Sequence, residues 1–235
     1  MLHVEGLEKR FGGLRAVTGA TFHLQPGVIT ALIGPNGSGK TTTFDLITGN
    51  VRPNAGVVRF GGRDITGLSP WQVARLGLGR TFQLPRLFGE MTVLENMTAA
   101  VREGTLREVV HRALDLLDFV GLTAQAEAPA SSLSYGQRKL TELARVLMLR
   151  PRLVLLDEPF AGVNPTLARA IADHLLALQQ QGTTFLVIDH DMPLVMGLAE
   201  TVLVMDMGSV IAEGAPKDVR EDPRVREAYF GTARP

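Results

Sequence analysis

Two kinds of apolar spacing divide the chain into predicted strands and helices. Apolar and polar residues alternate in 16–27, which indicates a half-buried strand. Continuous apolar runs, which indicate buried strands, follow at 28–34, 152–159, 183–190 and 201–214. Elsewhere apolar residues recur every three to four positions, the period of an amphipathic helix. The predicted helices span 41–50, 69–77, 92–102, 106–121, 133–149, 166–181 and 191–199.

The order of these elements predicts an α/β fold. Strands that alternate with helices form a mostly parallel sheet. Two short β-like runs within 57–66, on either side of a Gly61-Gly62 pair, predict a hairpin and indicate an added antiparallel β-subdomain. The central helices predict an inserted α-helical subdomain at 84–149, between the core segments 1–83 and 150–235 of a single domain.

Composition limits the classes of protein to which the chain can belong. Its 235 residues suit one domain, and 24 basic side chains balance 24 acidic ones, which leaves no basic field for nucleic acid. The absence of cysteine excludes disulfides and thiolate metal sites. The first residues lack a continuous apolar segment, and apolar runs such as 153–156 are short. We therefore expect a soluble chain with neither a signal peptide nor a membrane span.

A phosphate-binding motif follows the second predicted strand. Residues 34–42, GPNGSGKTT, match G-x-x-x-x-G-K-[ST] between a buried strand and a helix, and we call them the phosphate loop. In such a loop, backbone N–H groups and the helix N-terminus face phosphate oxygens. A plain glycine-rich turn would leave the lysine and the hydroxyl unexplained. Lys40 is predicted to reach the β- and γ-phosphates and Thr41 to bind Mg²⁺. The predicted nucleotide ligands are Gly34, Pro35, Asn36, Gly37, Ser38, Gly39, Lys40, Thr41 and Thr42.

Two carboxylates end the predicted strand at 152–159. Asp157 and Glu158 stand at its carboxyl end, where ligands of α/β sheets bind. Asp157 is suited to hold Mg²⁺ through water. Glu158 comes next in the chain, so its side chain can point elsewhere, toward an attacking water for which it would be the general base. The alternative, an ordinary acidic loop, is weakened by the phosphate loop.

Two further polar residues end strand-like runs. Gln83 closes the run LGRTFQ before the helical insert, and its neutral amide can contact Mg²⁺ or the attacking water. His190 ends another predicted strand and can donate to the γ-phosphate from the same sheet edge. Each has a plain alternative when taken alone: Gln83 as a surface glutamine, and His190 as a structural residue at a helix start.

Residues 133–137, LSYGQ, which we call the signature turn, open the last central helix. Ser134 and Gln137 form the S-x-x-Q pattern of a capping box, which alone would explain them. A helix N-terminus with a serine hydroxyl and with Gly136, which permits close backbone approach, is also an anion site. The two interpretations are compatible, and the second predicts another phosphate-binding end in the chain.

Five motifs in this order resemble the ATP-binding subunits of ABC proteins, over essentially the whole chain: GPNGSGKTT, Gln83, LSYGQ, LVLLDEP and DHD. The resemblance implies a RecA-like P-loop core that binds and hydrolyses ATP with Mg²⁺. It implies pairing head to tail with a second ATPase subunit, a copy or a homologue. Ser134, Gly136 and Gln137 would then serve the partner's nucleotide. By the same resemblance, Phe11 would stack on adenine; its alternative is a core position in the β-subdomain.

Several stretches are similar, more narrowly, to ATP-binding subunits of branched-chain amino-acid importers. They span 80–97, 157–165, 189–200 and 225–231. Ala161, Gly162 and Asn164 stand where many ABC proteins carry Ser, Ala and Asp. The importer resemblance implies transmembrane permease subunits, an indirect extracytoplasmic substrate-binding protein, and a place on the cytoplasmic face of the inner membrane.

Residues 84–91, LPRLFGEM, which we call the apolar loop, are the expected permease contact. Leu84, Leu87 and Phe88 would grip a partner helix there. The alternative is that they fill the core of the helical subdomain.

Other functions remain open at this stage. ATPases of urea or amide importers and of lipopolysaccharide exporters are similar in pattern. A soluble ABC ATPase acting on nucleic acid or ribosomes usually carries long coiled coils or two ATPase domains, and this chain has neither. A small-molecule kinase would leave the signature turn and His190 unexplained. The sequence favours the ATP-hydrolysing subunit of an importer for branched-chain or related amino acids, with no nucleic-acid partner.

Overall fold

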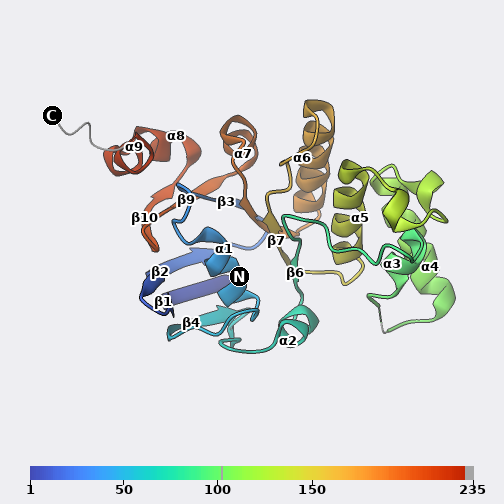
Figure 1. Ribbon diagram of the computed structural model, residues 1–235, viewed down its shortest axis with the longest axis horizontal. Helices are drawn as coiled ribbons and strands as arrows, with labels where there is room; N and C mark the ends of the chain where they lie inside the picture. Colours follow the sequence, from blue (N-terminus) through green and yellow to red (C-terminus); the bar gives the residue numbers. More distant parts are fainter. Residues whose placement is uncertain (102, 231–235) are drawn as a thin grey trace.

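The computed structural model describes residues 1–101 and 103–230, and its centre is a six-stranded sheet (Figure 1). The strands, in spatial order, are β10 (Ser209–Gly214), β9 (Thr201–Asp206), β3 (Ile29–Ile33), β8 (Thr184–Ile188), β7 (Leu153–Asp157) and β6 (Leu78–Arg80). All neighbours pair in parallel except β9 and β10, which form a hairpin. The carboxyl ends of β3, β7 and β8 therefore meet at one edge of the sheet.

A second, antiparallel sheet lies beside the first. Its order is β2 (Leu14–Leu24), β1 (Leu2–Phe11), β4 (Ala55–Phe60) and β5 (Arg63–Asp64). The pattern of apolar residues did not predict β1. Its pairing with β2 shifts register between Val4 and Leu7 and again before Lys9, so the buried residues do not keep a period of two.

Nine α-helices are formed by the described residues: α1 (Lys40–Ile47), α2 (Pro70–Arg75), α3 (Val93–Thr98), α4 (Leu106–Phe119), α5 (Tyr135–Leu147), α6 (Pro165–Gln180), α7 (Met192–Leu198), α8 (Pro216–Glu221) and α9 (Pro223–Phe230). Helices α3, α4 and α5 gather at one side of the molecule (Figure 1). Two short 3₁₀ turns, Thr123–Gln125 and Ala130–Ser132, connect α4 to α5.

The helix boundaries differ from prediction in two places. The helix expected at 92–102 ends at Thr98, and its last residue, 102, lies outside the described residues. The pattern did not predict α8 and α9, because each is short and begins with proline, a residue that usually marks a loop. Residue 231, the end of the importer-like stretch 225–231, also lies outside the described residues.

The main sheet separates two apolar cores. Alternate strand residues such as Ile33 and Val187 pack on the side of α5, α6 and α7, whereas Leu32 and Leu186 pack with Phe44 of α1 and with the antiparallel sheet. The fold class is thus confirmed: a mostly parallel sheet, an antiparallel addition and a group of helices. No helix in the described part of the chain combines the length and apolar character needed to cross a bilayer.

Candidate active site

The phosphate loop joins β3 to α1 at the carboxyl edge of the main sheet. The Lys40 ammonium lies inside the loop and donates hydrogen bonds to the carbonyl oxygens of Gly34 (2.7 Å) and Pro35 (3.0 Å). Gly39, just before α1, has a φ of 102°, and a Cβ there would lie 2.4 Å from the carbonyl oxygen of Ala16. Residue 39 must therefore be glycine, because of both its left-handed backbone and this close approach.

The loop combines a buried cation with accessible backbone. Loss of water around the Lys40 ammonium lowers its pKa, and the carboxylates of Glu158 and Asp157 act in the opposite direction. Ser38 is buried beside the lysine, whereas Asn36, Gly37 and Thr41 are exposed and Thr42 is half-buried. The arrangement suits a polyanion that reaches the backbone from outside and the ammonium within.

Asp157 forms a buried ion pair that the sequence did not predict. Arg80 Nη2 lies 3.0 Å from Asp157 Oδ2, and Arg80 Nη1 lies 2.6 Å from Asp45 Oδ1 of α1. Burial raises the pKa of Asp157, and the hydrogen bond and charge of Arg80 oppose that rise. Since no described side chain or backbone group bonds to Oδ1, that oxygen is the one left to face a hydrated cation.

Arg80 links three elements beside the phosphate loop. Its guanidinium carbon lies 5.6 Å from the ring centroid of Phe44 and 5.0 Å from that of Phe82, and Nη1 donates to Thr48 Oγ1 at 3.1 Å. The signal for this role was present in the sequence. An arginine within a buried strand is almost always paired, and Arg80 precedes Gln83 by only three positions.

Gln83, Glu158 and His190, far apart in the sequence, meet at one carboxylate. Glu158 Oε2 accepts a hydrogen bond from Gln83 Nε2 (2.8 Å), and Glu158 Oε1 lies 3.0 Å from His190 Nε2. Glu158 has a φ of 51°, a left-handed backbone that costs a residue with a side chain about 1–2 kcal/mol. The consecutive carboxylates of Asp157 and Glu158 therefore have different partners, as two different roles would require.

Asp189 supports the cluster formed by Gln83, Glu158 and His190. Its buried carboxylate accepts hydrogen bonds from the backbone N–H groups of Phe160 (2.8 Å), His190 (2.7 Å) and Asp191 (3.1 Å). These bonds fix the segment that follows Glu158 and the start of the segment that carries His190. The motif DHD is visible in the sequence, but no local pattern predicts this role for its first aspartate.

The signature turn forms the predicted capping box at the start of α5. Ser134 Oγ accepts from the N–H of Gln137 (3.3 Å), and Gln137 Oε1 accepts from the N–H of Ser134 (2.9 Å). A Cβ at Gly136 would lie 2.3 Å from Leu167 Cδ2, so packing within the chain also favours glycine there. No hydrogen bond among the described residues joins Ser134, Gly136 or Gln137 to the phosphate loop. These three predicted ligands therefore stand apart from the others.

Phe11 lies at the end of β1, where the chain turns into β2. Its side chain is 48% exposed, so it is not a core residue of the β-subdomain. Lys9 Nζ lies 5.1 Å from the Phe11 ring centroid. An exposed aromatic ring beside a cation offers a stacking surface for a nucleobase.

The predicted Mg²⁺ ligands are a hydroxyl (Thr41), an amide (Gln83) and a carboxylate (Asp157). Oxygen ligands of these kinds suit Mg²⁺, which usually keeps several waters and shares substrate phosphates. The described residues contain no group of three or more His, Cys, Asp or Glu able to hold a metal ion. The donor set therefore fits a cation that arrives with the nucleotide rather than one held by protein ligands alone.

The apolar loop is divided between surface and core. Leu84 is 72% exposed and Phe88 is 60% exposed, whereas Leu87 packs against the apolar core that includes residues of α3, α4 and α5. The loop is held in place, because Asn96 bonds both the N–H and the carbonyl of Phe88 (2.8 and 2.9 Å), and Glu142 accepts from the N–H of Arg86 (2.9 Å). Neither Leu84 nor Phe88 is therefore explained by core packing.

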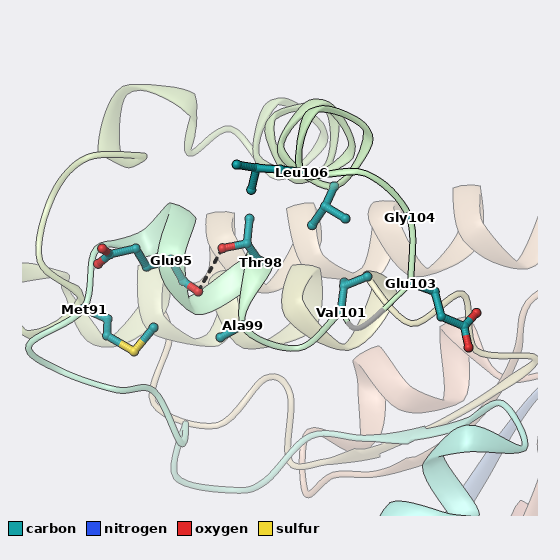
Figure 2. Close-up of a pocket in the computed structure, with 9 residues that line it drawn as sticks. Met91, Glu95, Thr98, Ala99, Val101, Glu103, Gly104 and Leu106 are labelled. Carbon is teal, nitrogen blue, oxygen red and sulfur yellow. Dashed lines mark hydrogen bonds between the residues drawn. The ribbon is translucent and has the colours of Figure 1, made fainter.

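A cavity of about 420 Å³ opens elsewhere, between α3 and α4 (Figure 2). Its wall includes Glu95, whose carbonyl accepts from Thr98 Oγ1 at 3.3 Å, as the dashed line in Figure 2 marks. The other lining residues are Met91, Ala99, Val101, Glu103, Gly104, Leu106 and Val109. None of the predicted nucleotide or catalytic residues takes part, so this cavity is separate from the candidate active site.

Comparison with known proteins places the site in a family context. The family model described as ABC transporter matches residues 17–161, and that described as Branched-chain amino acid ATP-binding cassette transporter matches 209–234. The chain is 39% identical to the high-affinity branched-chain amino acid transport ATP-binding protein LivG of Escherichia coli (strain K12), covering 99% of this chain and 98% of the relative. Identity and coverage are the same for BraF of Pseudomonas aeruginosa.

Solved structures agree with the sequence comparison. An ATP-binding cassette of an ABC transporter in its ADP conformation superposes with a TM-score of 0.89 at 38% identity, covering 98% of both chains. A nucleotide-free cassette superposes equally well, with 37% identity over 97% of this chain and 98% of that one. These likenesses confirm the resemblance to the branched-chain amino-acid importer group. By its motifs, its fold and its relatives, the chain belongs to the ABC transporter family, as one of its ATP-binding proteins.

Proposed function

We propose that this chain is the ATP-hydrolysing subunit of a membrane importer for branched-chain or related amino acids. The observation that carries the proposal is the convergence of Gln83 and His190 on Glu158, beside the phosphate loop. The near-full-length similarity to proteins named for branched-chain amino acid transport supports the substrate class.

The phosphate loop binds the triphosphate of ATP. Its backbone N–H groups and the start of α1 face the phosphate oxygens, and Lys40 exchanges its bonds to Gly34 and Pro35 for the β- and γ-phosphates. Thr42 completes the first turn of α1. Phe11 stacks on the adenine ring from the β1–β2 turn. When Mg²⁺ is bound with ATP, it neutralises charge on the β- and γ-phosphate oxygens.

Hydrolysis depends on the orientation of Glu158. Thr41, Gln83 and Asp157 supply the oxygen atoms that would hold Mg²⁺, and because Arg80 bonds Oδ2 of Asp157, Oδ1 is the atom that would serve as the ligand. The Glu158 carboxylate takes the proton of the attacking water. Gln83 and His190, each within 3.0 Å of that carboxylate, hold its plane, and His190 donates to the γ-phosphate once ATP is present.

A second ATPase subunit, a copy or a homologue, completes each site. Within the described part of the chain, no hydrogen bond joins the signature turn to its own phosphate loop, and the exposed serine of the turn lies at a helix start. In a head-to-tail pair, Ser134, Gly136 and Gln137 bind the γ-phosphate held by the partner. ATP then favours the closed pair, and hydrolysis favours its opening.

The apolar loop couples this cycle to permease subunits on the cytoplasmic face of the inner membrane. Leu84 and Phe88 are exposed, while Asn96 and Glu142 hold the loop's backbone. Gln83 immediately precedes the loop, so movement at the γ-phosphate reaches it directly. The extracytoplasmic substrate-binding protein acts only indirectly, through the permease.

Glu158→Gln tests the proposal. The substitution keeps the shape of the side chain but removes the base, so turnover is expected to fall by about 10²–10⁴-fold. ATP affinity, measured by calorimetry, stays within about threefold, and an ATP-dependent dimer accumulates in size-exclusion chromatography. Glu213→Gln, at an exposed position on β10, is the matched control and leaves turnover unchanged. Wild-type turnover in Glu158→Gln would exclude Glu158 as the base.

A second experiment tests the permease. Tagged chain is purified from detergent-solubilised membranes with wild-type sequence, with Phe88→Asp, or with Met207→Asp as a control at another exposed apolar position. Wild type and Met207→Asp are expected to retain two hydrophobic permease chains, and Phe88→Asp to lose them while still binding ATP. Retention of the permease by Phe88→Asp would exclude the apolar loop as the contact.

A further inference from the structure

The first turns of α5 contact both residues on which the proposed hydrolysis depends. The Tyr135 hydroxyl donates to the backbone carbonyl of Gln83 at 3.1 Å, and Lys139 Nζ donates to the backbone carbonyl of Glu158. Tyr135 and Lys139 are four positions apart and so share one face of the helix. The Gln83 and Glu158 side chains in turn bond each other at 2.8 Å. The four residues form a closed ring of contacts between α5, the residue before the apolar loop and the residue after β7.

Lys139 is well placed to hold the unusual backbone of Glu158. Its side chain is only 7% exposed, and its ammonium lies 5.3 Å from the Tyr135 ring centroid. Burial lowers the pKa of Lys139, while the surrounding carboxylates favour its charged form; they belong to Asp189, Glu158, Glu142 and Asp157. The acceptor is the carbonyl of a residue with a left-handed φ, so this bond favours the conformation that aims the Glu158 side chain.

Gly162 gives Tyr135 the room to reach Gln83. A Cβ at Gly162 would lie 2.9 Å from Tyr135 Cε1, and the φ of Gly162 is 73°. The departure from the common Ser-Ala-x-Asp pattern at 161–164 thus has a structural partner in the tyrosine of the signature turn. Beside it, Gly136 packs against Leu167 of α6. The segment after Glu158 therefore contacts the first turn of α5 at two glycines.

We propose that Tyr135 and Lys139 are positioning residues that connect the signature turn to the Gln83–Glu158 pair of the same chain. The inference rests on the proposed function, in which the signature turn receives the partner's γ-phosphate while Glu158 serves the chain's own nucleotide. When the partner's phosphate draws the start of α5 into place, the two hydrogen bonds carry the backbone of Gln83 and Glu158 with it. Occupancy of one nucleotide site thereby orients the base of the other.

The first test separates positioning from nucleotide binding. Tyr135→Phe removes only the hydroxyl, Lys139→Met removes the donor, and Lys139→Arg keeps a cationic donor. Both removals are expected to lower kcat by about tenfold, while the Kd for ATP stays within about twofold. Lys139→Arg is expected to recover most of the loss. Removals that leave kcat within twofold, or that weaken ATP binding as much as kcat, would overturn the proposal.

The second test asks which Glu158 is affected. Mixed dimers are made from two differently tagged chains, one of which carries Glu158→Gln, so that one competent site remains. Lys139→Met placed in the Glu158→Gln chain should leave the remaining activity unchanged. Placed in the other chain, it should lower that activity by about tenfold. The reverse pattern would show action on the partner's site and overturn the proposal. Full activity of a Glu158→Gln homodimer would instead overturn the proposed function itself.

Discussion

The phosphate loop and the signature turn are both helix starts that contain serine and glycine, but only the first encloses a cation. In the phosphate loop, Lys40 is buried and donates to two carbonyl oxygens of the loop. In the signature turn, Ser134 and Gln137 bond each other, and Ser134 is exposed. The first combines a buried ammonium with a glycine-rich backbone, whereas the second offers only a helix end and a hydroxyl.

The difference suggests a division of labour between the two regions. A single chain should bind ATP through the phosphate loop alone, since its anion ligands and cation belong to one segment. The signature turn should add little until a partner brings a phosphate to it. Substitutions near the phosphate loop are therefore expected to change the ATP affinity or the stability of a single chain. Substitutions at the signature turn are expected to change the ATPase activity of the paired chains.

The largest expected effect comes from Arg80, which braces the phosphate-loop side. Arg80→Met leaves buried Asp157 without its partner, and breaking a buried pair costs about 3–5 kcal/mol of unfolding free energy. Chemical denaturation measures the change. Arg59→Met, which breaks an exposed pair with Glu5, is the control and should cost less than about 1 kcal/mol. Equal effects in the two variants would show that Arg80 does not brace the site.

Lys40→Ala tests whether the phosphate loop is self-sufficient. Removal of a charged donor to phosphate is expected to cost about 2–3 kcal/mol, or about 30–150-fold in the Kd for ATP measured by calorimetry on the isolated chain. Lys217→Ala, at an exposed position of α8, is the control with unchanged affinity. If Lys40→Ala keeps wild-type affinity while circular dichroism shows it folded, the phosphate-loop assignment fails.

Ser134→Ala tests the other side of the comparison. Loss of the cap at the start of α5 costs about 1 kcal/mol of stability, as does Thr105→Ala at the equivalent box that begins α4. Only Ser134→Ala should also reduce turnover, by about tenfold, with ATP affinity of the isolated chain unchanged. An equal loss of turnover in both variants would show that Ser134 acts only as a helix cap.

The sequence predicted the phosphate-loop side more completely than the signature side, for a physical reason. The ligands of the phosphate loop are contiguous, and Asp157, Glu158 and His190 each lie at or just after the end of a buried strand, so the parallel sheet brings them to one edge. Strand periodicity also predicted the core strands, but β1 was missed because its bulges break the alternation.

The contacts around the signature turn could not be predicted in the same way. Tyr135 bonds Gln83, which lies 52 positions away in the sequence. Residue 162 is glycine because the Tyr135 ring leaves no room for a Cβ there. Such pairs depend on how α5 sits against β7, which no local pattern encodes. Arg80 could be predicted in part. A charged residue in a buried strand indicates that an ion-pair partner is present, but only the fold shows that Arg80 pairs with both Asp45 and Asp157.

The smallest expected effect concerns Glu142, which ties α5 to the apolar loop. Burial raises the pKa of Glu142 above its ordinary value of 4.5, so the folded state binds the proton more tightly than the unfolded one. The resulting stability is present below pH 4.5 and is lost as the pH rises through the folded-state pKa. Glu142→Gln lacks this dependence. The Tm of Glu142→Gln relative to that of wild type should therefore increase as the pH rises above 4.5, which thermal unfolding at several pH values measures.

Glu108→Gln provides the control of opposite sign. Hydrogen bonds from the Thr105 backbone and hydroxyl lower the pKa of Glu108, so its stabilisation is present above its ordinary value of 4.5 and is lost as the pH falls. The Tm of Glu108→Gln relative to that of wild type should therefore increase as the pH falls. The Tm of Glu142→Gln relative to that of wild type should instead increase as the pH rises toward neutral. If both differences run in the same direction, Glu142 does not hold the apolar loop as a desolvated carboxyl, and the link from α5 to that loop rests on other contacts, such as the hydrogen bond from Arg145 Nη2 to the carbonyl of Arg86.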